Sequence, residues 1–84
     1  MITKNHNPYI SDVNFKRIIR EMLLESQEPC LEQTSTEVNL WYNHPVYPRR
    51  LCHRMGMFRT MQQASNFVDR LYEIMETQRK ELGL

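Results

Sequence analysis

Acidic side chains are missing from the middle of this chain. No Asp or Glu occurs between Val38 and Val68, whereas four arginines do: Arg49, Arg50, Arg54 and Arg59. Residues 1–37 carry four basic and six acidic side chains, and residues 69–84 carry three and four. The formal net charge of +1 therefore conceals a basic central segment between two mildly acidic ones. A total so close to zero argues against a protein that coats nucleic acid without sequence preference.

Glycine and long apolar runs are also scarce. With two glycines, the chain has no glycine-rich loop that could cradle a phosphate, and it shows no nucleophile elbow or paired-carboxylate motif. No apolar run approaches the ~20 residues that a membrane-spanning helix needs, and the first residues lack the apolar stretch of a signal peptide. We therefore expect a non-enzymatic, cytoplasmic protein that does not bind membranes.

Cysteine is limited to Cys30 and Cys52, which is few for a small secreted domain, so we expect free thiols. Together with three histidines they are the only soft metal ligands, and no C-x2-C or H-x3-H pair occurs among them. The adjacent Cys52 and His53 would point to opposite faces of a strand. The sequence therefore predicts neither a metal site nor a cofactor.

A chain of 84 residues forms one domain, near the lower size limit for folding without help. We expect a single domain over residues 1–84, in which residues 1–10 form an extended lead-in. A core of this size is modest, so self-association would bury apolar surface that a monomer leaves in water. A homo-oligomer remains an open alternative to a monomer.

Two helices are predicted, one near each end of the chain. Ser11 can cap the first helix, at about 12–27, whose apolar stripe runs from Phe15 to Leu23 and which we expect Pro29 to end. Thr60, with a glutamine three residues later, forms a capping box for the second helix, at about 61–81, and Gly83 follows as a stop.

The central segment predicts two antiparallel strands. Residues 38–43 and 50–58 alternate between apolar and polar positions, the period of a half-buried strand. Residues 44–48 carry two prolines and form the loop, while residues 28–36 show no periodicity and are expected to be a connection. Gly56 indicates a bulge or a close backbone approach. The fold class is α+β, a small α-β-β-α domain, with helical continuation of residues 49–58 as the alternative.

Alternation places Trp41 and Asn43 on one sheet face with Arg50, Cys52 and Arg54. The opposite, core-facing side takes the apolar residues Val38, Leu40, Tyr42, Leu51, Met55 and Met57. Three interpretations of Trp41 are open. It can be the centre of a recognition patch, since tryptophan and arginine often dominate binding energy; it can simply stack under an arginine stem; or a register error can put it in the core.

These observations predict a small protein-binding regulator or inhibitor that acts through a central Arg/aromatic surface on an acidic partner protein. The predicted partner-binding residues are Trp41, Asn43, Tyr47, Arg49, Arg50, Arg54 and Arg59. A nucleic-acid-binding module for RNA or a single strand, using the same residues, is one alternative. A structural homo-oligomer that assembles through the long C-terminal helix is another.

Overall fold

The structure, a computed structural model, describes residues 9–44 and 46–84. Its elements, in chain order, are α1 (Asp12–Leu24), β1 (Cys30–Thr34), β2 (Glu37–Asn43), β3 (Arg50–Met57) and α2 (Met61–Leu82). This confirms the predicted α+β class, with three strands in place of two. Most of the expected lead-in, residues 1–8, and the first loop proline, Pro45, lie outside the described residues.

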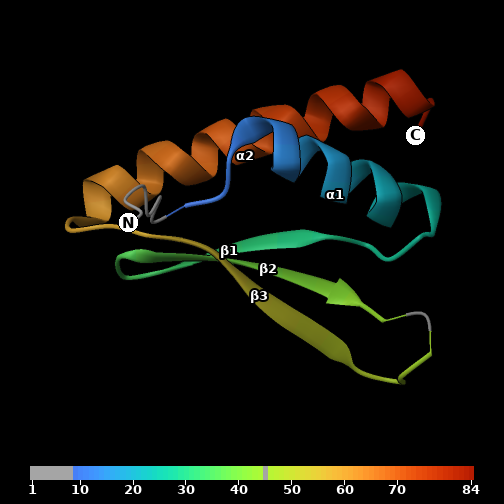
Figure 1. The fold of residues 1–84 in the computed structure, drawn as a ribbon, viewed down its shortest axis with the longest axis horizontal. Coiled ribbons are helices and arrows are strands. Elements are labelled where there is room, and N and C mark those ends of the chain that lie inside the picture. Colours follow the sequence, from blue (N-terminus) through green and yellow to red (C-terminus); the bar gives the residue numbers. More distant parts are fainter. Residues whose placement is uncertain (1–8, 45) are drawn as a thin grey trace, which may run out of the picture.

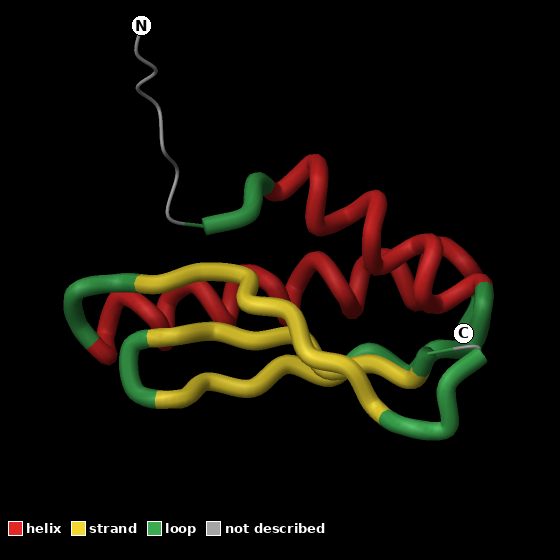
Figure 2. Tube along the Cα trace, turned by 60° about the horizontal axis from the view of Figure 1, so that its bottom comes forward, coloured by secondary structure: helices red, strands yellow, loops and turns green. Residues whose placement is uncertain are grey.

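The three strands form one antiparallel sheet in the order β1-β2-β3, and both helices lie on the same side of it (Figure 1). Turned by 60°, the strands are seen side by side with α2 running along them (Figure 2). The core is a single cluster between the helices and the sheet. Its members that are entirely removed from solvent are Phe15, Ile19, Val38, Leu40, Ala64 and Leu71.

The helix starts follow the local signals in the sequence. The Ser11 hydroxyl accepts a hydrogen bond from the Asn14 amide at 3.2 Å, and the Thr60 hydroxyl accepts one from the Gln63 amide at 3.1 Å. The side-chain oxygen of Gln63 in turn accepts from the Arg59 amide. These contacts satisfy amide groups that have no partner within the helix. No helix in the described part of the chain is long and apolar enough to cross a membrane.

The helix ends differ from the prediction at one place. α2 runs to Leu82 and ends in Gly83 with a φ of 76°, as the glycine signal indicates. The prediction that α1 extends to about residue 27 is wrong, because the helix ends at Leu24. Ser26 and Glu28 adopt left-handed φ values of 56° and 50°, so the chain has already left the helix before it reaches Pro29.

The predicted connection over residues 28–36 contains the strand β1, which was missed. Its inward side chains are the buried Leu31 and the half-buried Gln33, so only one of them is apolar. Gln33 is accommodated by polar contacts: its amide nitrogen donates to the Met61 carbonyl, and its oxygen accepts from the Ser65 hydroxyl, both at 3.1 Å. Because this inward residue is polar, the sequence lacks the alternation of apolar and polar residues by which strands are recognised.

A bulge in β3 corrects the predicted face of one residue. Val38 pairs with Gly56 but the next residue, Asn39, pairs with Arg54, so Met55 is the extra residue on β3. Beyond this point the alternation is displaced by one position. Met55 packs in the core as predicted, whereas Met57 lies opposite Glu37 on the outer face and is 44% exposed.

Gly56 also allows a close backbone approach. Tyr9 forms an isolated antiparallel bridge with Gly56, and the Ile10 amide donates to the Met55 carbonyl at 2.8 Å. The segment that leads into α1 is thereby attached to the edge of β3. A Cβ atom added at Gly56 would lie 2.9 Å from the Tyr9 Cβ and 3.0 Å from the Phe58 ring. Both features that the sequence suggested for this glycine are present.

We expect the Gly56→Ala substitution to lower the free energy of unfolding by about 1–3 kcal/mol, since the added methyl group has no room. Urea unfolding followed by circular dichroism measures the change. Cys52→Ala, at an exposed position of the same strand, is the control and should stay within about 0.5 kcal/mol of the parent chain. Equal stabilities of the two variants would contradict the close approach.

Candidate functional site

The helices cover one side of the sheet, and its other side, called here the open face, carries the outward side chains of all three strands. The register and the alternation assign them as Cys30, Glu32 and Thr34 on β1, Glu37, Asn39, Trp41 and Asn43 on β2, and Arg50, Cys52, Arg54 and Met57 on β3. All of them are exposed or half-buried. This surface contains most of the residues that the sequence singled out.

The open face is divided by charge into two sides. In one cross-strand row, Glu32, Asn39 and Arg54 stand side by side on β1, β2 and β3. In a second row, Asn43 pairs with Arg50 on one side, and on the other its amide donates to the Glu28 carboxylate at 2.6 Å. Each of these rows therefore has a carboxylate on the β1 side, an amide in the middle and a guanidinium on the β3 side.

Trp41 occupies the row between these two, with Cys30 on one side and Cys52 on the other. Its ring is half-buried on the open face, so the interpretation that a register error puts it in the core is wrong. The indole N–H donates to Oε1 of Glu32 at 2.9 Å. Its polar partner is thus a carboxylate from β1, not an arginine stem. This bond fixes the ring across the centre of the face.

The arginines of the open face keep most of their donors available. Nε of Arg54 lies 3.6 Å from a Glu37 oxygen, and its Nη1 lies 2.8 Å from the Met57 sulfur. The Arg54 side chain is nevertheless 57% exposed, and ion pairs of this kind contribute little in water. Arg50 is exposed as well. Both guanidinium groups can therefore bind carboxylates of a partner in their planar, two-donor geometry.

The seven predicted partner-binding residues do not form one surface. Trp41, Asn43, Arg50 and Arg54 share the open face, as the alternation predicted. Tyr47 and Arg49 lie in the exposed loop between β2 and β3, where the Arg49 amide donates to the Tyr47 carbonyl at 2.8 Å. Arg59 follows the far end of β3, next to the start of α2, so it lies beyond the open face, although it lines a groove together with Arg54. Partner binding by any of them stays a prediction.

Sequence reasoning missed the acidic side of the site. Glu28, Glu32 and Glu37 lie outside the acid-free segment of the sequence, yet each carboxylate contacts a residue of that segment. Cross-strand pairing brings them there, and β1 was not recognised as a strand. The available signal was the short alternation of Leu31 and Gln33 with Glu32 and Thr34. The site is therefore of mixed charge, not uniformly basic.

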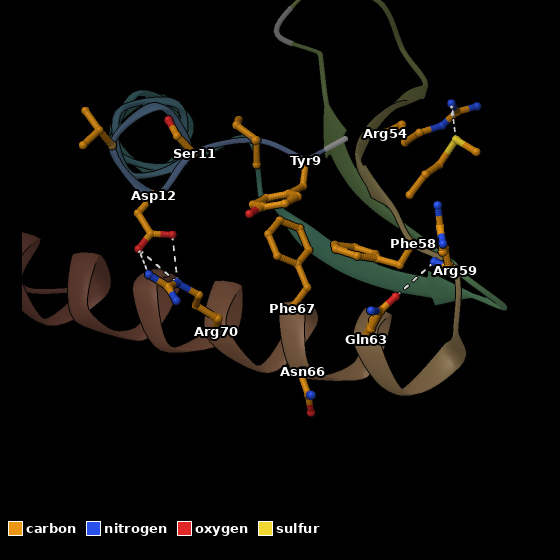
Figure 3. A pocket seen from close by; sticks show the side chains of 13 residues that line it. Tyr9, Ser11, Asp12, Arg54, Phe58, Arg59, Gln63, Asn66, Phe67 and Arg70 are labelled. Carbon is orange, nitrogen blue, oxygen red and sulfur yellow. Dashed lines mark hydrogen bonds and ion pairs between the residues drawn. The ribbon is translucent and has the colours of Figure 1, made fainter. Parts of the chain in front are cut away.

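An open groove adjoins the site between the start of α1, the end of β3 and the start of α2 (Figure 3). Its floor is a cluster of three rings, in which Tyr9 and Phe58 each lie within 5.3 Å of Phe67, centre to centre. Arg54 and Arg59 stand at one end, and an ion pair between Asp12 and Arg70 stands at the other. The ring cluster continues the core, so it stabilises the fold whether or not a ligand enters.

The Asp12–Arg70 pair joins the two helices. Nε of Arg70 donates to the Asp12 carboxylate at 2.9 Å, and this hydrogen bond holds the pKa of Asp12 below its usual value. A depressed pKa means that the pair stabilises the fold above the pKa of the unfolded carboxyl group, and that this contribution is lost as the pH falls through the folded value. Because Asp12 occupies it, Arg70 is less available to a ligand in the groove.

No known protein family matches the chain, and neither the curated proteins nor the solved structures contain a significant match. Within residues 9–44 and 46–84, no group of three or more His, Cys, Asp or Glu side chains is placed to hold a metal ion.

The Cys52 thiol reports on the charges of the open face. Partial desolvation raises its pKa above the usual value, and the negative charges of Glu32 and Glu37 raise it further. At a pH below that pKa, less thiolate is present, so alkylation should be slow.

In a Cys30→Ser variant, we expect iodoacetamide to modify Cys52 with a rate midpoint at higher pH in the folded chain than in urea. Glu32→Gln should lower the midpoint.

The matched control is Glu73→Gln, which removes a carboxylate from the exposed side of α2. It should leave the midpoint unchanged. If Glu32→Gln and Glu73→Gln gave the same pH profile, the effect of the Glu32 charge on the Cys52 pKa would be contradicted.

Proposed function

We propose that this protein is a small non-enzymatic regulator or inhibitor that docks its open face on another protein. The observation that carries the proposal is the half-buried Trp41 at the centre of a solvent-facing sheet, with Arg50 and Arg54 diagonally opposite it on β3. Tryptophan and arginine are the residue types most often found at the energetic centre of interfaces. A ring that is already restrained by its hydrogen bond to Glu32 also loses less conformational freedom on binding.

The charge division of the open face narrows the kind of partner. The β3 side, with Arg50 and Arg54, suits carboxylates, whereas the β1 side, with Glu28 and Glu32, suits basic or hydrogen-bond-donating groups. The partner proposed from the sequence was acidic throughout, and on the structure that chemistry fits only the β3 side. A partner with both kinds of charge in the matching order would be favoured in affinity, orientation and specificity.

The carboxylates of the open face favour a protein over a nucleic acid as its partner. Phosphate-dominated binding grows with the number of cations that contact the backbone. Here two arginines share the face with Glu32 and Glu37, whose carboxylates would repel phosphates.

We place the activity in the cytoplasm, a reducing compartment that suits the two exposed free thiols.

Capture by the immobilised full chain from an extract of the native host tests this proposal. We expect Trp41→Ala, and separately Arg54→Ala, to reduce recovery of a specifically bound protein at least tenfold, which corresponds to about 1.4 kcal/mol. Both side chains are at the surface, so the circular dichroism spectrum should not change. Arg17→Ala is the matched control, because it removes an exposed arginine of α1, on the side of the sheet opposite to the open face.

Equal recovery by the Trp41→Ala and Arg17→Ala variants would contradict docking through the open face. The nucleic-acid alternative is measured with the same variants on single- and double-stranded RNA over a range of salt concentrations. Suppose that the chain binds RNA with micromolar affinity, that this affinity falls steeply with salt, and that Arg54→Ala abolishes it. The partner of the open face would then be a nucleic acid and not a protein.

A further inference from the structure

We infer that the open face binds a second copy of this chain, face to face, around a two-fold axis that runs along β2. The inference rests on the proposed function, in that it takes the open face to be a protein-docking surface, and it names the partner. The charge pattern of the two rows described above, Glu32–Asn39–Arg54 and Glu28–Asn43–Arg50, is complementary to itself under one rotation and under no other simple one.

A rotation by 180° about an axis parallel to the strands, in the plane between two stacked sheets, exchanges the edges of the sheet. β1 of one copy then lies over β3 of the other, and β2 lies over β2. The carboxylate side of each copy faces the guanidinium side of its partner. An axis perpendicular to the strands would instead lay β1 over β1 and β3 over β3, so that like charges would meet. The pattern therefore selects the first axis.

The rows match individually under this rotation. Glu32 faces the second copy's Arg54, because the two residues end the same cross-strand row on opposite sides of Asn39. Glu28 faces the second copy's Arg50 for the same reason, with Asn43 between them. Symmetry repeats each contact, so every charge of these two rows meets its opposite. Glu37 lies on β2 and therefore faces the second copy's Glu37, and the Arg54 guanidinium of the same chain, 3.6 Å away, offsets this repulsion. Isologous interfaces of two-fold dimers have this property of self-complementarity.

The central row of the interface, between the two charged rows, contains an aromatic ring and two thiols in place of charges. Trp41 lies on the central strand, so the axis places it against the second copy's Trp41, with a cysteine on either side. Stacked sheets pack about 10 Å apart, a gap that large side chains from both faces can fill. Glu32 would be satisfied on burial, since one oxygen already accepts the indole N–H and the other is free to accept from Arg54 of the second copy.

Charge-swap variants of the full chain give the sharpest test, with sedimentation velocity as the readout. The wild-type chain should be a dimer at tens of micromolar. Arg50→Glu/Arg54→Glu makes both charged rows wholly acidic, and Glu28→Lys/Glu32→Lys makes both rows wholly basic; Glu37, outside the two rows, is unchanged in each variant. Each variant alone should dimerise at least a hundredfold more weakly than the wild-type chain. An equimolar mixture of the two should form a heterodimer, because every facing pair of the two rows is then of opposite charge.

The chain that carries all four substitutions is the internal control. Its acidic and basic sides are exchanged, so it should again form a homodimer, which neither a misfolded variant nor a simple loss of charge would do. Circular dichroism of each variant checks the fold. A wild-type dimer that is unaffected by the charge swaps would overturn the inference and would favour assembly through another surface, such as α2.

Thiol cross-linking adds a second, independent readout. Cys30 should face the second copy's Cys52, whereas identical cysteines lie diagonally across the interface and farther apart. A short bis-maleimide should therefore link a mixture of Cys30→Ser and Cys52→Ser chains into covalent dimers several times more efficiently than either variant alone. Equal yields in the three samples would contradict the proposed axis.

The failure of this inference differs from the failure of the proposed function. A wild-type chain that stays monomeric at tens of micromolar overturns the second copy as partner. If Trp41-dependent capture of a different protein is then observed, the proposed function stands and only its partner was wrongly identified. A monomer without such capture overturns both.

Discussion

Two helices cover one side of a three-stranded sheet, and in the described residues nothing covers the other side. The core gathers on the helix side, where Phe15, Leu40 and Leu71 are entirely buried. The outward side chains of the same strands must then face water or a partner. On that side, less of the apolar surface of a large ring is removed from water than in the core. The outward position of Trp41 therefore lowers the stability of the isolated chain. The functional account depends on this asymmetry.

The bulge at Met55 determines which side chains meet across the sheet. It offsets β3 by one residue against β2, which aligns Arg54 with Asn39 and Glu32 and turns Met57 outward. The same position receives the Tyr9–Ile10 segment on the free edge of β3, so an otherwise open strand edge is partly occupied. One irregularity thus sets both the pattern of the open face and the attachment of the segment before α1.

Local signals in the sequence predicted the parts of the fold that local forces determine. The caps at Ser11 and Thr60 and the stop at Gly83 depend on hydrogen bonds within a few residues, and all three are present. The alternation of β2 correctly placed Trp41 outside the core. β1 was not predicted as a strand because its inward residue Gln33 is polar, and the α2 residues that satisfy Gln33 are distant in sequence.

The carboxylates of the site were missed for a related reason. A count along the chain finds an acid-free segment, but a sheet brings residues from different segments into one row. Glu32 reaches Trp41, and Glu37 reaches Arg54, only through strand pairing. The candidate site therefore changed from a basic patch to a divided one, although four of its seven predicted residues do share the open face.

The contacts of the single tryptophan test the central claim most directly. In a nuclear Overhauser spectrum of the isotope-labelled full chain, the account predicts cross-peaks from the indole protons to the Hβ protons of Cys30 and Cys52, its directly opposite neighbours on the two adjacent strands. These contacts exist within one chain, so they do not depend on the oligomeric state. Cross-peaks from the indole to Phe15, Ile19 or Leu71 would place the ring among the core residues and contradict the account.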